Sequence, residues 1–192
     1  MAKKYEFQPD KPYSSWLNKL QLTKQQRRQV LKWCLYALML VIASVLHDVV
    51  LCRLRLFGGT FDLVPCCIFL ICVLEGSQNG CIFALVAAYL YLLSGTAPGP
   101  HIVVLITVIA TLAAIFRQAF LHPGFPAAVL CSAMAMMLYE SAVYAFCLLL
   151  GRTTPERFVS FMVPILLSVA TIPVTYPIAK AIAATGGEVW KE

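Results

Sequence analysis

Charge is scarce in this 192-residue chain. Asp, Glu, Lys and Arg make up 12% of the residues, about half the usual share in a soluble globular domain, whereas 60% are hydrophobic and the mean hydropathy is +0.80. Such a composition excludes an ordinary water-soluble fold and leaves no room for a separate soluble domain of usual size. It predicts an all-α polytopic membrane protein.

Motifs of reactive chemistry are also missing. The sequence contains no HExxH, GxSxG or GxxxxGK[ST] pattern. None of the eight cysteines has a spacing suited to zinc, and all but Cys52 lie inside apolar runs, so we expect them to be small buried hydrophobic residues. We therefore predict no catalytic residue, no cofactor and no metal. No cleavable signal peptide is expected either, because no small-residue cleavage site follows the first apolar run.

Hydrophobic runs divide the chain into a leader, a membrane domain and a tail. Residues 1–23 are polar or amphipathic, residues 24–185 form a single helical membrane domain, and residues 186–192 are a short tail. The leader is expected either to lie at the membrane interface as a short helix or to be disordered. Within the membrane domain, the pattern predicts four long helices, the last of which contains three prolines and is expected to be kinked. These helices cover residues 24–51, 102–116, 126–150 and 157–184.

Two shorter apolar runs lie at the centre of the sequence. Residues 61–74 and 81–93 are separated by a polar turn, residues 75–80, in which Gly76 and Gly80 permit a tight reversal. A helix of about 14 residues covers roughly 21 Å, less than the hydrocarbon core of about 30 Å, and lipid cannot satisfy the polar groups at its ends. We expect two short central helices shielded by the four longer ones, giving about six transmembrane helices, or a re-entrant hairpin with four complete spans.

Basic residues are concentrated near the amino terminus, where residues 1–32 hold eight Lys and Arg against two acidic residues. Retention on the cytoplasmic side and contact with anionic lipid explain this bias better than nucleic acid does. Both ways of counting the helices place the two termini on one side of the membrane. The distribution of Lys and Arg, eleven against four, predicts that both termini are cytoplasmic.

Few ionisable side chains are expected at membrane depth, and each is a candidate contact. Glu140 is the deepest; a proton relay, a substrate or partner contact, and an internal hydrogen bond to a Tyr, Ser or backbone group are the alternatives. Asp62 begins the first short arm, where the helix dipole favours a negative charge. Glu75 ends that arm, which is the unfavourable end. We therefore expect Glu75 to have a partner, with Arg117 or a residue of the leader as candidates.

His47 and Asp48 lie near the outer end of the first long helix. Because adjacent residues of a helix point in different directions, they do not form a ready-made dyad. We expect them to act as an interfacial cap or to pair with Arg53 or Arg55.

Three short patterns mark the central stretch, residues 61–101. The patterns are Asp-Leu-Val at residues 62–64, Leu-Glu-Gly at residues 74–76 with Gly80, and Leu-Leu-Ser-Gly at residues 92–95 with Gly99 and His101. Together with the proline-bearing last helix, these patterns resemble the bacterial rod shape-determining MreD family. Tyr91 stands where that family often has a carboxylate.

The resemblance implies a non-enzymatic membrane scaffold of the bacterial cell-elongation machinery, which maintains rod shape and supports peptidoglycan synthesis. It implies a location in the bacterial cytoplasmic membrane and an MreC-type single-pass membrane protein as partner. The wider assembly would include MreB, a peptidoglycan polymerase and a transpeptidase. A homodimer is left open.

The resemblance also implies a fold similar to the substrate-binding S subunits of energy-coupling-factor vitamin transporters, so a vitamin-binding subunit is the alternative function. No outer loop rich in Trp, Asn and Arg supports it. An intramembrane enzyme that uses Glu140 is a third alternative. The candidate partner or structural contacts are Asp62, Glu75, Gly76, Gly80, Gly95 and Glu140.

Overall fold

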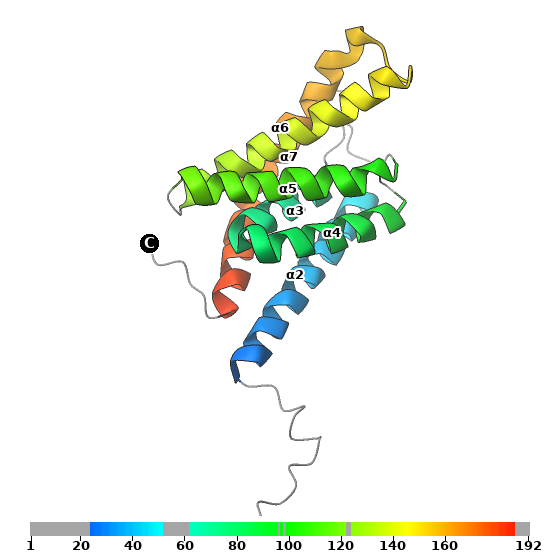
Figure 1. Cartoon of the computed structure of the whole chain (residues 1–192). Coiled ribbons are helices and arrows are strands. Elements are labelled where there is room, and N and C mark those ends of the chain that lie inside the picture. The colour runs from blue at the N-terminus through cyan, green and yellow to red at the C-terminus, as the bar shows by residue number, and fades with distance from the viewer. Residues whose placement is uncertain (1–23, 52–61, 96, 98, 122–123, 187–192) are drawn as a thin grey trace, which may run out of the picture.

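A computed structural model describes the membrane domain as a bundle of helices (Figure 1). The leader, the tail beyond Gly186, and the link that contains Arg53 and Arg55 lie outside the described residues. Expectations about these segments stay predictions. The described residues are 24–51, 62–95, 97, 99–121 and 124–186.

All regular structure in the described ranges is helical, which confirms the predicted all-α polytopic membrane protein. Four helices are long and apolar enough to cross a membrane, and two shorter apolar helices lie between the first and second of them. In chain order the elements are α2 (Lys24–Val49), α3 (Leu63–Glu75), α4 (Ser77–Leu93), α5 (His101–Phe120), α6 (Phe125–Leu149), the 3-10 helix η2 (Pro155–Arg157) and α7 (Phe158–Thr185).

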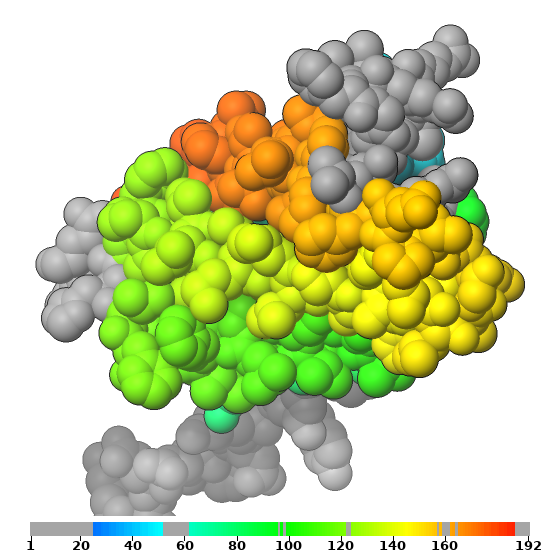
Figure 2. All heavy atoms as spheres, turned by 90° about the horizontal axis from the view of Figure 1, so that it is seen from above, coloured from blue at the N-terminus to red at the C-terminus, as the bar shows by residue number. Residues whose placement is uncertain are grey.

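The four long helices turn large apolar side chains outward. Figure 2 shows one such face, where α6 lies between α5 and α7. Side chains that would be costly to expose to water are stable in hydrocarbon, so these outer faces are suited to lipid. Examples are Val41 on α2, Val104 and Leu112 on α5, Leu138 on α6, and Leu166 and Val174 on α7.

Helix α3 lies at the centre and is enclosed by protein. All twelve residues from Leu63 to Leu74 are buried, and the helix packs against each of the other five helices. Thirteen residues extend about 20 Å, too short to span the hydrocarbon core alone. The expectation of a short helix shielded by longer ones is therefore correct for α3.

The same expectation is wrong for α4. Its small residues Ala84, Ala87 and Ala88 pack inward, whereas Ile82, Val86 and other large apolar side chains are exposed on its outer face. With 17 residues, α4 extends about 25 Å, closer to the thickness of the hydrocarbon core. One short arm is thus internal, and the other forms part of the outer surface.

The reversal between α3 and α4 is tighter than the predicted polar turn. Gly76 alone separates the two helices, with a φ of +87° that favours glycine. Gly80 has a different role, because it lies within the first turns of α4. A Cβ added at Gly80 would be 2.7 Å from Cys72 Sγ and 2.9 Å from the Cys72 carbonyl oxygen. Gly80 therefore permits the close approach of α4 to α3, and the expectation that it serves the turn is wrong.

We predict that Gly80→Ala destabilises the protein by about 1–3 kcal/mol, because the added methyl group overpacks the contact with the Cys72 backbone. In an unobstructed helix the same change would stabilise by up to about 1 kcal/mol. Thermal unfolding in detergent measures the difference. Gly124→Ala is the control, since its φ is extended and the nearest atom to its added Cβ is 3.6 Å away. Equal stability of the Gly80 variant and the wild type would contradict the close contact.

Candidate functional site

Both ends of α3 carry a carboxylate that contacts polar side chains of other helices. At the carboxyl end, Glu75 accepts a hydrogen bond from Lys32 Nζ at 2.6 Å and another from the Tyr36 hydroxyl at 2.8 Å. The side chains of Lys32 and Glu75 are 7% and 6% exposed, so this is a buried ion pair. A buried pair of this kind is costly to break, because the remaining charge lacks both water and a partner.

Aromatic rings cover the ion pair on the α4 side. The rings of Trp33, Tyr36 and Phe83 lie within 5.7–5.9 Å of one another, and Lys32 Nζ is 5.3 Å from the Trp33 ring centroid. Rings at this spacing add packing energy and exclude water from Glu75.

Glu75 has a partner, as expected. The partner is Lys32 in α2, which was not among the candidates named from the sequence, because α2 runs antiparallel to α3 and brings its beginning beside the end of α3. Arg117 is buried and interacts electrostatically with Cys131 and Tyr176, and the leader lies outside the described residues. The close neighbour from α5 is Gln118: its Nε2 lies beside Gly76, and its Oε1 accepts a hydrogen bond from Ser77 at 3.0 Å.

At the amino end of α3, Asp62 is the N-cap residue, but its side chain does not cap the helix. Its carboxylate accepts a hydrogen bond from the Tyr91 hydroxyl at 3.3 Å, and its backbone N–H donates to Ser168 Oγ at 2.8 Å. The carboxyl groups of Asp62 and Glu140 lie within hydrogen-bonding reach of each other, and His47 lies close enough to act electrostatically on Asp62. We call these five residues the junction cluster.

The junction cluster brings together five of the six helices. Asp62 is partly exposed, whereas His47, Tyr91, Glu140 and Ser168 are buried. The polar group of another helix that lies nearest to Glu140 is thus a carboxyl group, rather than the Tyr, Ser or backbone partner considered from the sequence. His47 is buried inside the protein. Its proposed partners Arg53 and Arg55 lie outside the described residues.

Tyr139 lies beside the junction cluster. Its ring packs edge-on against Phe69 at 5.9 Å, and its side chain is 1% exposed. The hydroxyl interacts electrostatically with Asp62, Tyr91 and Glu140 but has no hydrogen-bond partner within the described part of the chain. This buried hydroxyl therefore has unused hydrogen-bonding capacity in the neighbourhood of the carboxyl pair.

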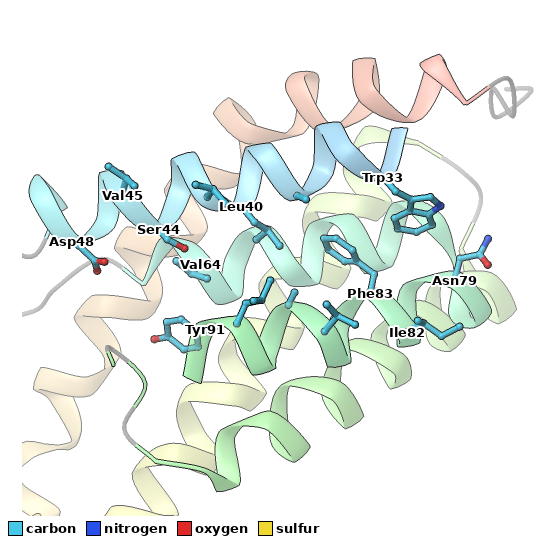
Figure 3. A pocket seen from close by; sticks show the side chains of 15 residues that line it. Trp33, Leu40, Ser44, Val45, Asp48, Val64, Asn79, Ile82, Phe83 and Tyr91 are labelled. Carbon is cyan, nitrogen blue, oxygen red and sulfur yellow. The ribbon is translucent and has the colours of Figure 1, made fainter. Parts of the chain in front are cut away.

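A groove separates α2 from α4, with Val64 of α3 at its base (Figure 3). Its volume is about 700 Å³, and most of its lining is apolar. Trp33 and Asn79 lie at one end, and Asp48 and Tyr91 lie at the other. We call it the α2–α4 groove. It meets the junction cluster at Tyr91, which belongs to both.

A smaller apolar groove of about 330 Å³ lies between α5 and α6. Leu112 of α5 and Met134 of α6 are among its lining residues, and both are exposed. Because no ionisable side chain other than Cys131 reaches it, this groove provides a matched apolar control for the α2–α4 groove.

Gly95 and the cysteines were also singled out in the sequence, and the structure shows where they lie. Gly95 follows α4 with a φ of +78° and has open space around it, so it serves the turn and joins neither polar cluster. Of the seven described cysteines, four are buried as expected, whereas Cys34 is exposed on α2. Within the described ranges, no three His, Cys, Asp or Glu side chains are arranged to hold a metal ion.

Sequence reasoning missed Lys32 and Tyr36 as the partners of Glu75, and it did not place His47 or Tyr91 beside Asp62. These contacts depend on how helices far apart in the sequence align. Residue spacing within one helix could not have revealed these contacts, because the paired residues are separated by as many as 43 positions in the sequence.

No family model, curated protein or solved structure matches this chain.

We predict that Lys32→Met lowers the free energy of unfolding by about 3 kcal/mol, because it leaves the Glu75 charge buried and without a cation. Adding Glu75→Gln should restore most of the loss, since the neutral amide can still accept from Tyr36. Thermal unfolding in detergent measures both. Arg27→Met on the exposed start of α2 is the control and should have little effect. The ion pair would be unimportant if Lys32→Met were as stable as the control.

Proposed function

We propose that the protein is a non-enzymatic membrane scaffold that holds a transmembrane helix of a partner in the α2–α4 groove. The observation that carries the proposal is the groove itself, which is apolar, lies along two helices of the membrane domain and is filled by no described part of the chain. Helix-in-groove docking is a common mode of recognition between proteins.

The groove has the dimensions of a helix. From Trp33 to Asp48 it follows α2 for about 22 Å. Its walls repeat every three or four residues, which is the spacing that receives the side chains of another helix. Small residues such as Ala37, Ser44 and Ala87 permit close approach. The repeating positions are Trp33, Ala37, Leu40, Ser44 and Asp48 on α2, and Asn79, Phe83, Val86 and Leu90 on α4.

Polar groups lie at the ends of the groove rather than at its centre. The exposed carboxylate of Asp48 is placed to meet a basic residue that flanks a partner helix. A water-soluble vitamin would need several convergent polar groups around its own. A partner helix therefore fits the lining better than the ligand of a transporter S subunit, which is the alternative.

The resemblance of residues 61–101 to the MreD family makes the proposal specific. It implies an MreC-type single-pass protein as the partner and the elongation machinery, with MreB, a peptidoglycan polymerase and a transpeptidase, as the wider assembly. It also implies a bacterial cytoplasmic membrane, and the distribution of Lys and Arg favours both termini in the cytoplasm. Helix α4, which forms one wall of the groove, lies within this stretch.

We predict that Val86→Trp weakens binding of the MreC-type transmembrane helix by at least about tenfold, because the indole overfills the groove. Energy transfer between labelled protein and labelled partner helix in lipid vesicles measures the affinity. Leu112→Trp in the α5–α6 groove is the matched control, since Leu112 is 56% exposed and Val86 is 54% exposed.

Equal affinity of the two variants would contradict docking in the α2–α4 groove. Energy transfer between two copies of this chain, lost with Val86→Trp, would show instead that a homodimer occupies the groove.

A further inference from the structure

The carboxyl groups of Asp62 and Glu140 are close enough to share a proton. An ionised carboxylate has no hydrogen to donate, so two carboxyl groups can bond to each other only when one of them is protonated. Two charged carboxylates in contact inside a protein repel each other strongly, and acidic pairs of this kind commonly share a single proton. Within the junction cluster, the carboxyl groups of Asp62 and Glu140 are therefore suited to hold one proton between them.

Groups from four helices lie near the Asp62–Glu140 pair. Helix α2 contributes His47 and α3 contributes the Cys66 thiol, which interacts electrostatically with Asp62. Helix α4 contributes Tyr91 and α7 the hydroxyl of Ser168. The exposed carboxylate of Asp48 lies at the adjoining end of the groove.

Tyr139 on α6 supplies an independent observation. Its hydroxyl is nine-tenths buried or more, is close enough to both carboxyl groups to interact with them electrostatically, and lacks a hydrogen-bond partner within the described residues. A buried hydroxyl in this state is costly unless a partner is available for part of the time. A carboxylate that gains and loses a proton is such a partner.

We propose that Asp62 and Glu140 form an exchangeable proton-binding site in the membrane domain, and that Tyr91 couples its occupancy to the α2–α4 groove. On release the proton passes to water through the partly exposed Asp62, and two carboxylates remain. Their repulsion separates the pair and shifts Tyr91, which donates a hydrogen bond to Asp62 and also lines the groove (Figure 3). The coupling rests on the proposed docking function, whereas the proton site does not.

Infrared spectroscopy of the protein in lipid bilayers tests the proton site. We expect a C=O stretching band of a protonated carboxyl group at neutral pH that shifts in D₂O. The band is lost in the double variant Asp62→Asn/Glu140→Gln and loses intensity or shifts in Glu140→Gln, which keeps a hydrogen-bond donor toward Asp62 and is the variant to use if the double variant does not fold. Glu75→Gln is the matched control and leaves the band unchanged, because Glu75 lies at the opposite end of α3 and contacts the ammonium group of Lys32 rather than a second carboxyl group.

A band that persists unchanged in Glu140→Gln or in the folded double variant would overturn the proton site. Loss of the band on adding sodium at constant pH would also overturn it, because the pair would then bind a metal cation instead.

The coupling is tested by measuring affinity for the partner helix across the pH range in which the band disappears. We expect the affinity of the wild type to change on the order of tenfold over this range, which is typical of coupled sites, and that of Glu140→Gln to stay constant. A constant wild-type affinity would overturn the coupling and leave the proton site standing. Absence of any binding would overturn the docking function and the coupling, while the infrared result would still decide the proton site.

Discussion

The structure depends on the burial of a helix that is too short for the membrane it occupies. Helix α3 extends about 20 Å, so its terminal backbone groups and both terminal carboxylates would face hydrocarbon if lipid surrounded it. The five other helices remove this cost by enclosing it. At one end Lys32 and Tyr36 neutralise and solvate Glu75, and at the other Tyr91 and Ser168 bind Asp62. The polar contacts at the two ends thus fix the register of α3 against its neighbours.

The position of α3 determines where the functional surfaces lie. Because α3 occupies the centre, α4 is displaced to the outside, where it runs beside α2 and leaves the α2–α4 groove above Val64. The same arrangement places the amino end of α3 against α6 and α7, which brings Asp62 to Glu140. The groove and the junction cluster therefore follow from one packing constraint, and Tyr91 lies where they meet. Docking and proton binding, as proposed, would be two properties of a single helix junction.

Much of the fold could be predicted from the sequence, because stability in lipid depends mainly on the length and apolarity of a segment. These properties identified four long helices and two short ones, and the odd position of Glu75 indicated a partner. Neither property specifies which helices align. The pairing of Glu75 with Lys32, and of Asp62 with Glu140 and Tyr91, depends on contacts between distant segments. Likewise, Gly80 resembled a turn residue until its contact with Cys72 was known, and the exposure of α4 depends on which short arm takes the centre.

The most direct test of the buried central helix is its accessibility to lipid. A photoactivated diazirine carried on a lipid acyl chain inserts into any side chain that the hydrocarbon reaches, and mass spectrometry locates the adducts by residue. The account predicts adducts on the outer faces of α2, α4 and α5, including Ile42, Val86 and Val104, which are exposed. It predicts none on residues 63–74, which are buried. Adducts on α3 in the folded protein at a level similar to those on α4 would contradict the account.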